Sequence, residues 1–168
     1  LVFAVLVSGV SVAQEKKLRH ADETFEAEEY YKAMQEYTAL LKKIKGKNDK
    51  VEIYYKIGEC YFLSGYYKKA RSNYRRAAKS KGFMVKAKNR LAEIEIQEDN
   101  FEAAIQLFNE VLEVKKDDTT ALEGLKSANW ALEQYSLPTR WVIEKAKHLN
   151  SKANDFCPSI DEKDGFDH

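Results

Sequence analysis

The feature that most constrains how this chain folds is a pattern that recurs every 34 residues. Small residues mark it: Gly58 and Ala92 lie 34 positions apart at one phase, and Ala70 and Ala104 at another. The alanine of an earlier copy, Ala33, precedes Ala70 by 37 positions, because the intervening linker carries three extra residues. A helical period of this length is typical of helix-turn-helix solenoids. Such units stack to bury their apolar faces and usually present an extended surface to another protein, so the pattern predicts binding and not catalysis.

The composition fits one domain with a modest core. The 168 residues carry a formal net charge of +1, and 33% of them are charged. Nucleic-acid binding needs a one-sided basic field, so a net charge near zero gives no support to nucleic acid as the main partner. With only two prolines and seven glycines, the chain is not a Pro/Gly-rich low-complexity sequence.

The first residues differ from the rest. Leu1 to Val12 is apolar apart from two serines and a glycine, and Ser11-Val12-Ala13 places small residues where a signal peptidase reads them. We therefore expect residues 1–13 to be a signal peptide, with cleavage before Gln14 and export to the periplasm. The stretch is shorter than the roughly 20 residues that a membrane-spanning helix needs, so no direct membrane span is expected. The alternative is a buried helix or strand.

Helical spacing divides the array into units near 14–47, 51–84 and 85–118, followed by a capping helix at 119–135. When each unit is numbered from its first residue, position 8 is the small residue of the first helix, and Gly58 there should let a second helix approach closely. The inward residues of the second helices are expected to be Ala33, Tyr37 and Leu40; Ala70, Tyr74 and Ala77; and Ala104, Phe108 and Val111. The capping helix should cover the third unit with Leu122, Leu125, Ala128 and Leu132.

This register resembles the tetratricopeptide repeat over about residues 15–135. The residues that carry the resemblance best are Gly58, Tyr61, Ala70, Tyr74 and Ala77. The departures are Thr24 and Glu95 in place of an aromatic residue, Lys17 and Lys88 in place of a bulky one, and the lack of a closing proline. The resemblance implies an all-α, right-handed helix-turn-helix solenoid of about three units plus a capping helix, with an irregular C-terminal tail.

Beyond the array the sequence loses its period. Trp141 begins a stretch that resembles the junction leading into a β-propeller in a group of Bacteroidetes envelope proteins; its runs are Leu149-Asn150-Ser151, Asp155-Phe156-Cys157-Pro158-Ser159 and Asp164-Gly165. Those proteins place a signal peptide and tetratricopeptide repeats before the propeller and an OmpA-like domain after it, and some belong to type IX secretion. The resemblance implies that residues 136–168 are a linker and the start of a propeller, and that later domains provide outer-membrane association.

The first helices of the units should form the binding groove, since positions 2, 5, 9 and 12 usually face it in tetratricopeptide repeats. These positions hold carboxylates mixed with aromatic residues, a composition suited to a peptide or helix. The candidate residues are Leu18, Asp22, Phe25, Glu52, Tyr55, Glu59, Phe62, Lys86, Asn89, Glu93, Ile96 and Trp130. Tyr55 and Glu59 are expected to point away from the core between units. The alternative is that the apolar members pack only between helices and that the charges are solvated.

Other chemistry finds little support. We expect no catalytic residues, no metal site and no cofactor, because the histidines are far apart in sequence and His20, at an apolar position of its unit, should be a partly buried structural residue. The acidic tail residues would need an oxygen ligand where Ile160 stands to form an EF-hand loop. A chaperone-type carboxylate clamp is disfavoured, since only Lys86 and Arg90 fit its positions.

These observations predict an exported, non-catalytic scaffold that mediates contact with a protein or peptide partner in the bacterial envelope. Two alternatives stay open: a periplasmic assembly factor that binds client peptides, and the regulatory arm of a larger enzyme. Export would permit a disulfide between Cys60 and Cys157, but the sequence does not bring the two thiols together.

Overall fold

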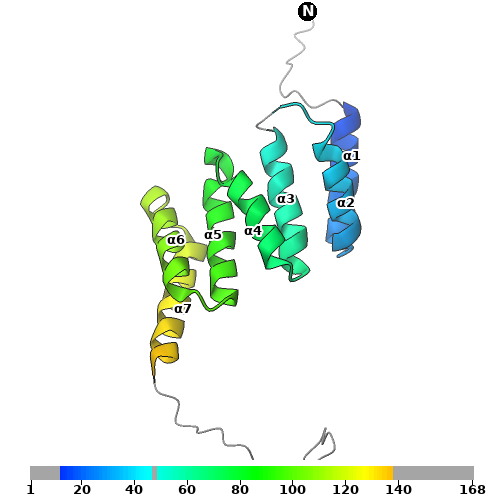
Figure 1. The fold of residues 1–168 in the computed structure, drawn as a ribbon. Coiled ribbons are helices and arrows are strands. Elements are labelled where there is room, and N and C mark those ends of the chain that lie inside the picture. The colour runs from blue at the N-terminus through cyan, green and yellow to red at the C-terminus, as the bar shows by residue number, and fades with distance from the viewer. Residues whose placement is uncertain (1–11, 47–48, 138–168) are drawn as a thin grey trace, which may run out of the picture. The chain divides into compact units, whose positions relative to one another are not determined.

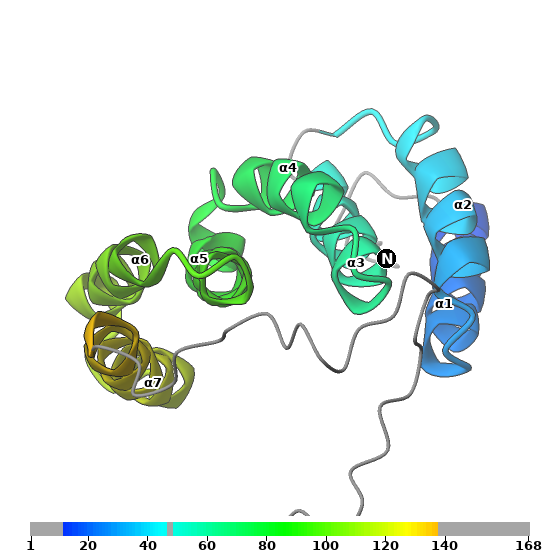
Figure 2. The ribbon, with the colours of Figure 1, turned by 60° about the horizontal axis from the view of Figure 1, so that its bottom comes forward.

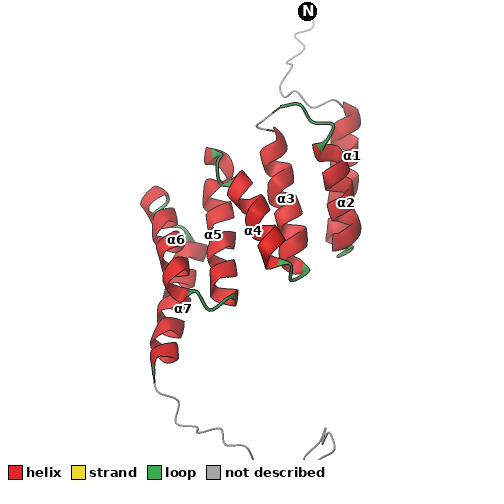
Figure 3. Cartoon of the chain, in the orientation of Figure 1, coloured by secondary structure: helices red, strands yellow, loops and turns green. Residues whose placement is uncertain are grey.

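A computed structural model describes residues 12–46 and 49–137, and within them the chain forms helices joined by short turns, without a strand. Figure 1 shows the order of the helices, and Figure 3 shows the connections between them. The seven helices are α1 (Val12–Glu26), α2 (Tyr30–Leu41), α3 (Asp49–Leu63), α4 (Tyr67–Ala77), α5 (Lys81–Gln97), α6 (Phe101–Val114) and α7 (Thr119–Ser136). The predicted all-α solenoid is therefore confirmed.

The helices pack mainly on their neighbours in the chain, from α1 on α2 through to α6 on α7. The first helices of successive units also touch, α3 against α5 and α5 against α7. Figure 2 shows α3 beside α4 and α5 beside α6. Residues Leu1–Ser136 form one compact unit, and of a second unit, Leu137–His168, only Leu137 is described. The predicted signal peptide up to residue 11 and the predicted propeller junction lie outside the described residues.

The core is a row of three apolar clusters between successive helices. The first joins α1, α2 and α3, the second draws on α4 and α5, and the third joins α5, α6 and α7. All nine residues expected to point inward from the second helices are buried: Ala33, Tyr37, Leu40, Ala70, Tyr74, Ala77, Ala104, Phe108 and Val111. The inward register predicted from the 34-residue period is confirmed.

Two glycines allow aromatic rings to lie directly against a helix backbone. A Cβ added to Gly58 would lie 2.6 Å from a ring carbon of Tyr74, which confirms the close approach predicted there. A Cβ on Gly124 would lie 2.2 Å from the ring of Phe108. Contact of α7 with the third unit thus runs through Gly124 and the fully buried Ala121 and Ala128.

The apolar face predicted for the capping helix needs a correction. Leu122 is 39% exposed, while Leu125 and Leu132 are half-buried. Ala128 is buried and Leu125 packs against the third cluster, as predicted, whereas Leu122 stands outside the close contact that Gly124 and the two alanines make with α6.

Each first helix ends in the same turn. Glu28, Gly65 and Asp99, all at position 15 of their units, have φ values of 60°, 77° and 58°. The next residue donates its N–H back to position 11: Glu29 to the Thr24 carbonyl, and likewise Tyr66 to Tyr61 and Asn100 to Glu95. This is the Schellman arrangement, which satisfies the last carbonyls of a helix and favours glycine at the left-handed position. Asn100 precedes α6 but makes no side-chain cap bond, and its amide donates to the Glu95 carboxylate instead.

The departures from the aromatic position 11 have local explanations. Thr24 is buried and its hydroxyl donates to the His20 carbonyl at 3.0 Å, while Glu95 accepts from Arg71 of α4 at 3.1 Å. The expectation that His20 is partly buried was wrong. Its side chain is 64% exposed between Glu23 and Glu36, because an imidazole on this solvent-facing side of α1 gains more from water and carboxylates than from burial.

Candidate functional site

A hollow of about 380 Å³, hereafter the first-helix hollow, lies on the face formed by the first helices. Side chains from α1, α2, α3 and α5 line it, so it crosses the first three units. The lining residues are Asp22, Phe25, Glu26, Tyr37, Glu52, Tyr55, Lys56, Glu59, Phe83 and Lys86.

One wall of the hollow is a polar link between the first two units. The Asp22 carboxylate accepts a hydrogen bond from the Tyr37 hydroxyl at 2.6 Å and an ion pair from Lys56 of the next unit, also at 2.6 Å. Burial, followed by the hydrogen bond to Asp22, raises the pKa of Tyr37 well above its usual range. Tyr37 is therefore a fixed neutral donor, and the charge of Asp22 is balanced by Lys56.

The same link recurs one unit later in a more buried form. Glu59 accepts from the Tyr74 hydroxyl at 2.5 Å and from two guanidinium nitrogens of Arg90 at 2.9 and 2.8 Å. Burial alone would lower the pKa of Arg90, but hydrogen bonds to Glu59 and Glu93 outweigh it and raise that pKa. Paired donation of this kind is the strong geometry for a carboxylate, so α3, α4 and α5 are held together at this point.

Together the two links form a ladder with the period of the repeats. An acid at position 9 accepts from a tyrosine at position 24 of its own unit and from a base at position 6 of the next. In the third unit Phe108 occupies the position of the tyrosine, and Gly124 occupies the position of the base in the following unit. These two residues meet in the apolar contact described above. The acid there, Glu93, pairs with Arg90 at 2.6 Å instead. The ladder therefore ends before α7.

Aromatic rings form the floor of the hollow. Tyr55 lies between Tyr74 and Phe83, with both pairs of ring centroids 5.6 Å apart. Burial, and next the nearby charge of Glu59, raise the pKa of Tyr55 to about 12, although Arg90 acts in the opposite direction. The floor is thus neutral at physiological pH and offers ring faces to an entering group.

The charges left for a partner are mostly negative. Asp22 and Glu59 are already balanced, whereas Glu26 is exposed and makes no ion pair within the described residues. The side chain of Glu52 is 46% exposed and lies 3.4 Å from Lys56, which also serves Asp22. Lys86 is the exposed base on the α5 side. Two available carboxylates beside aromatic rings favour a cationic group over an anionic one.

The structure gathers about half of the predicted groove residues. Six of them line the hollow: Asp22, Phe25, Glu52, Tyr55, Glu59 and Lys86. The others lie elsewhere. Leu18 and Phe62 pack against the first and second core clusters, and Ile96 against the third. Trp130 is 65% exposed on α7.

Two predicted residues serve the scaffold itself. Asn89 is buried, and its amide donates to Asp118 at 2.9 Å, which in turn accepts the Ala121 N–H at the start of α7. Glu93 is held by Arg90. The expectation that Tyr55 and Glu59 point away from the core between units was also wrong, because both contact Tyr74 and join α3 to its neighbours. These residues lie at groove positions of the repeat, but polar partners within the array hold Glu59, Asn89 and Glu93.

Sequence reasoning missed four lining residues. Tyr37 was expected only in the core, yet its hydroxyl reaches the hollow; Lys56, at position 6, was not considered. Glu26 and Phe83 lie at the end of α1 and the start of α5, outside the four groove positions. A search for Tyr and Lys or Arg at matching phases of the 34-residue period could have found the ladder.

Within residues 12–46 and 49–137, no three His, Cys, Asp or Glu side chains are grouped so that they could hold a metal ion. No helix in the same ranges has the length and apolar character of a membrane span. Cys60 is a free, buried thiol, and Cys157 lies outside the described residues.

Comparison with known proteins identifies the repeats. The tetratricopeptide repeat family model matches residues 51–82 and 85–118. No match was found among curated protein sequences. The tetratricopeptide domain of Sgt2 from Aspergillus fumigatus is similar with a TM-score of 0.65 at 19% identity, over 82% of this chain and 93% of that one.

Two similar solved structures contain peptides. The first tetratricopeptide domain of Spaghetti (RPAP3), bound to the HSP90 peptide SRMEEVD, has a TM-score of 0.64 at 19% identity, over 74% of this chain and 97% of that one. The type III secretion chaperone SycD of Yersinia enterocolitica, in complex with a peptide of the translocator YopD, has a TM-score of 0.60 at 18% identity, over 74% and 92%. At these identities the likeness establishes a tetratricopeptide-like helical fold.

Proposed function

We propose that this chain is a non-catalytic protein-interaction module whose first-helix hollow binds an extended peptide segment with a lysine or arginine side chain. The observation that carries the proposal is the composition of the hollow: the available carboxylates of Glu26 and Glu52 stand beside the rings of Phe25 and Tyr55. A cationic side chain there gains charge pairing and contact with the aromatic faces. The peptide-bound neighbours support the use of this fold for peptide binding.

The hollow is poorly suited to a C-terminal carboxylate. Arg90, which fits a clamp position, already gives two hydrogen bonds to Glu59 and one to Glu93. Lys56 is held by Asp22. Among the described side chains, Lys86 is the one base of the lining that has no ion pair. An entering carboxylate would therefore meet the negative charges of Glu26 and Glu52 against a single free base.

The test is selection from a random peptide library displayed on phage, followed by fluorescence anisotropy with the selected peptides. We expect lysine or arginine to be enriched at one position. The variant Glu26→Lys/Glu52→Lys should weaken binding at least about 10-fold, because two attractive charges become repulsive. The matched control Glu102→Lys/Glu113→Lys makes the same change of net charge on exposed residues of α6 and should bind as the parent does.

Two results would overturn the proposal. One is a selection without preference for basic residues. The other is equal loss of affinity in the two variants, which would mean that net charge and not the hollow governs binding. Both double variants replace exposed or half-exposed side chains, so their folding can be verified by circular dichroism before the binding measurement.

We further propose that the module is exported to the periplasm. There it would be the repeat region of an outer-membrane-associated protein similar to the PorE component of type IX secretion. The support is the apolar start of the sequence, the small residues at 11–13 and the resemblance of the residues after 141 to a propeller junction. Expression with a complete N-terminus in a Gram-negative host should give a periplasmic product that starts at Gln14. A product that retains the apolar residues would refute the signal peptide.

A further inference from the structure

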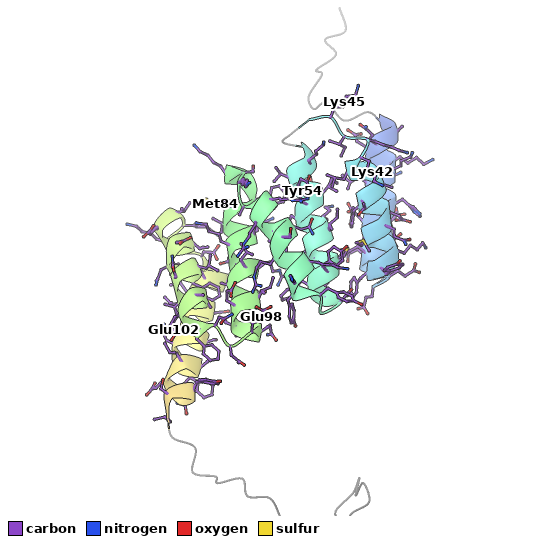
Figure 4. All side chains as sticks on the ribbon, viewed as in Figure 1. Lys42, Lys45, Tyr54, Met84, Glu98 and Glu102 are labelled. Atoms are coloured by element: carbon purple, nitrogen blue, oxygen red, sulfur yellow. The ribbon has the colours of Figure 1, made fainter. Side chains whose placement is uncertain are left out.

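The two edges of the helical stack carry opposite charge although the chain is nearly neutral at +1. The connections between units form one edge, and the turns within units form the other; Figure 4 shows Lys42 and Lys45 at the first edge and Glu98 and Glu102 at the second. The bases of the first edge, called here the basic edge, are Lys42, Lys43, Lys45, Lys50, Arg75, Arg76, Lys79, Lys81, Lys115 and Lys116. Its acids with described side chains are Glu15, Glu113, Asp117 and the buried Asp118, which pairs with Lys115.

The middle of the basic edge holds a hollow of about 590 Å³ that no described carboxylate lines. Its lining residues are Lys50, Val51, Tyr54, Arg76, Lys79, Ser80 and Lys81. The Arg76 guanidinium lies over the Tyr54 ring at 5.1 Å, which fixes its position. None of the four bases forms an ion pair with a described side chain, and the Ser80 hydroxyl makes no cap bond to α5. Four unbalanced cations and a free hydroxyl suit a phosphate-bearing group.

We propose that the basic edge docks on an anionic lipid surface, with a lipid phosphate in the hollow beside Arg76. The bases come from three successive connections between units and so extend across the stack. An acidic peptide in the hollow would leave Lys42, Lys45 and Lys116 unused. The opposite edge, which carries Glu98 and Glu102, faces away from the bilayer in this orientation. The first-helix hollow lies on a different face, so docking and peptide binding are independent.

The test is co-sedimentation of the full chain with vesicles of equal parts phosphatidylglycerol and phosphatidylcholine, compared with phosphatidylcholine alone. We expect the parent to prefer the anionic vesicles and to lose that preference as salt is raised. The variant Lys50→Glu/Lys79→Glu/Lys81→Glu should partition at least about 100-fold less, since each base near an anionic surface contributes to binding. The matched control Lys32→Glu/Lys68→Glu/Lys69→Glu changes three lysines near the opposite edge and should keep the preference.

Three outcomes would overturn the proposal. Equal sedimentation with both vesicle types would show that anionic lipid is not recognised. Equal loss in the two triple variants would assign any preference to net charge. If the parent ignored vesicles but bound a fluorescent polyglutamate peptide in a way that the Lys50/Lys79/Lys81 variant abolished, the edge would be a site for an acidic protein.

Discussion

The contact between Gly58 and Tyr74 allows a quantitative test of the helix register. In Gly58→Ala the new Cβ would lie 2.6 and 2.7 Å from two ring carbons, where ordinary carbon contacts are about 3.5–4 Å. The ring must therefore move by about 1 Å. It cannot do so freely, because Tyr74 is fully buried and its hydroxyl is held by Glu59 at 2.5 Å. Overpacking of this kind costs about 1–3 kcal/mol.

Alanine also has a higher helix propensity than glycine, by about 1 kcal/mol, which partly masks the steric cost. The control that removes this effect is Gly82→Ala in the first turn of α5, where an added Cβ meets no atom within 4 Å. We expect Gly82→Ala to be neutral or slightly stabilising, and Gly58→Ala to be less stable than it by about 1–3 kcal/mol. Gly58→Leu should cost more than either.

The measurement is urea denaturation followed by far-ultraviolet circular dichroism, with the free energy of unfolding extrapolated to water. If Gly58→Ala proved as stable as Gly82→Ala, the ring of Tyr74 would not lie against Gly58, and the register derived from the 34-residue period would be wrong. An unchanged slope with denaturant would show that the variants alter stability and not the extent of unfolding.

Three further predictions follow from single sites. Glu28→Gly and Asp99→Gly should each raise the free energy of unfolding by about 0.5–1 kcal/mol in urea denaturation, because glycine relieves the positive φ of these turns; a loss of stability would show that the turns are not left-handed. Burial would raise the pKa of Asp118, but hydrogen bonds from Asn89, the Ala121 N–H and Lys115 outweigh it and hold that pKa below its ordinary value of 3.8. Since the folded state favours the charged form, this stabilisation is present above about pH 4 and is lost as the pH falls through the lowered pKa. Asp118→Asn should therefore cost about 1–2 kcal/mol at pH 7, and thermal melts should show the difference from the parent shrinking below about pH 4. Burial raises the pKa of the Cys60 thiol to about 12, so in a Cys157→Ser background iodoacetamide should label Cys60 more than about 100-fold more slowly in the folded protein than in urea.

The 34-residue period predicted which residues are buried between helices, but not which polar side chains pair with one another. Ala70 and Ala104 recur at a fixed phase because helix packing repeats, so the inward residues followed directly. Hydrogen bonds between polar side chains depend on which residue of the next unit comes within reach. Asn89 stands at a groove position, yet a nearby aspartate, Asp118, takes its amide into the core. His20 stands at an apolar position of the repeat, yet its side chain is exposed beside carboxylates.

The candidate hollow illustrates the same division. Positions 2, 5, 9 and 12 identified the helices that line it and six of its residues. They could not identify Tyr37, whose ring is in the core while its hydroxyl is in the hollow. They also assigned Glu59 to a partner, although the structure uses its carboxylate to hold Arg90. A pattern of repeat positions does not contain the side-chain lengths and orientations that bring the Tyr37 hydroxyl into the hollow and the Glu59 carboxylate to Arg90.

Because the ladder of acids, tyrosines and bases ends before α7, contacts of two kinds hold successive helices of the stack together, and they are called joints here. The joints at Asp22 and Glu59 are ion pairs, and salt screens the more exposed pair at Asp22 more than the buried pair at Glu59. The joint at Gly124 is a ring packed on a helix backbone, which salt does not screen. Raising the salt concentration should therefore loosen the angle between the first and second units before it affects the joint at Glu59, while the angle between α6 and α7 stays fixed. The curvature that a peptide meets in the first-helix hollow then depends on the ionic strength around it.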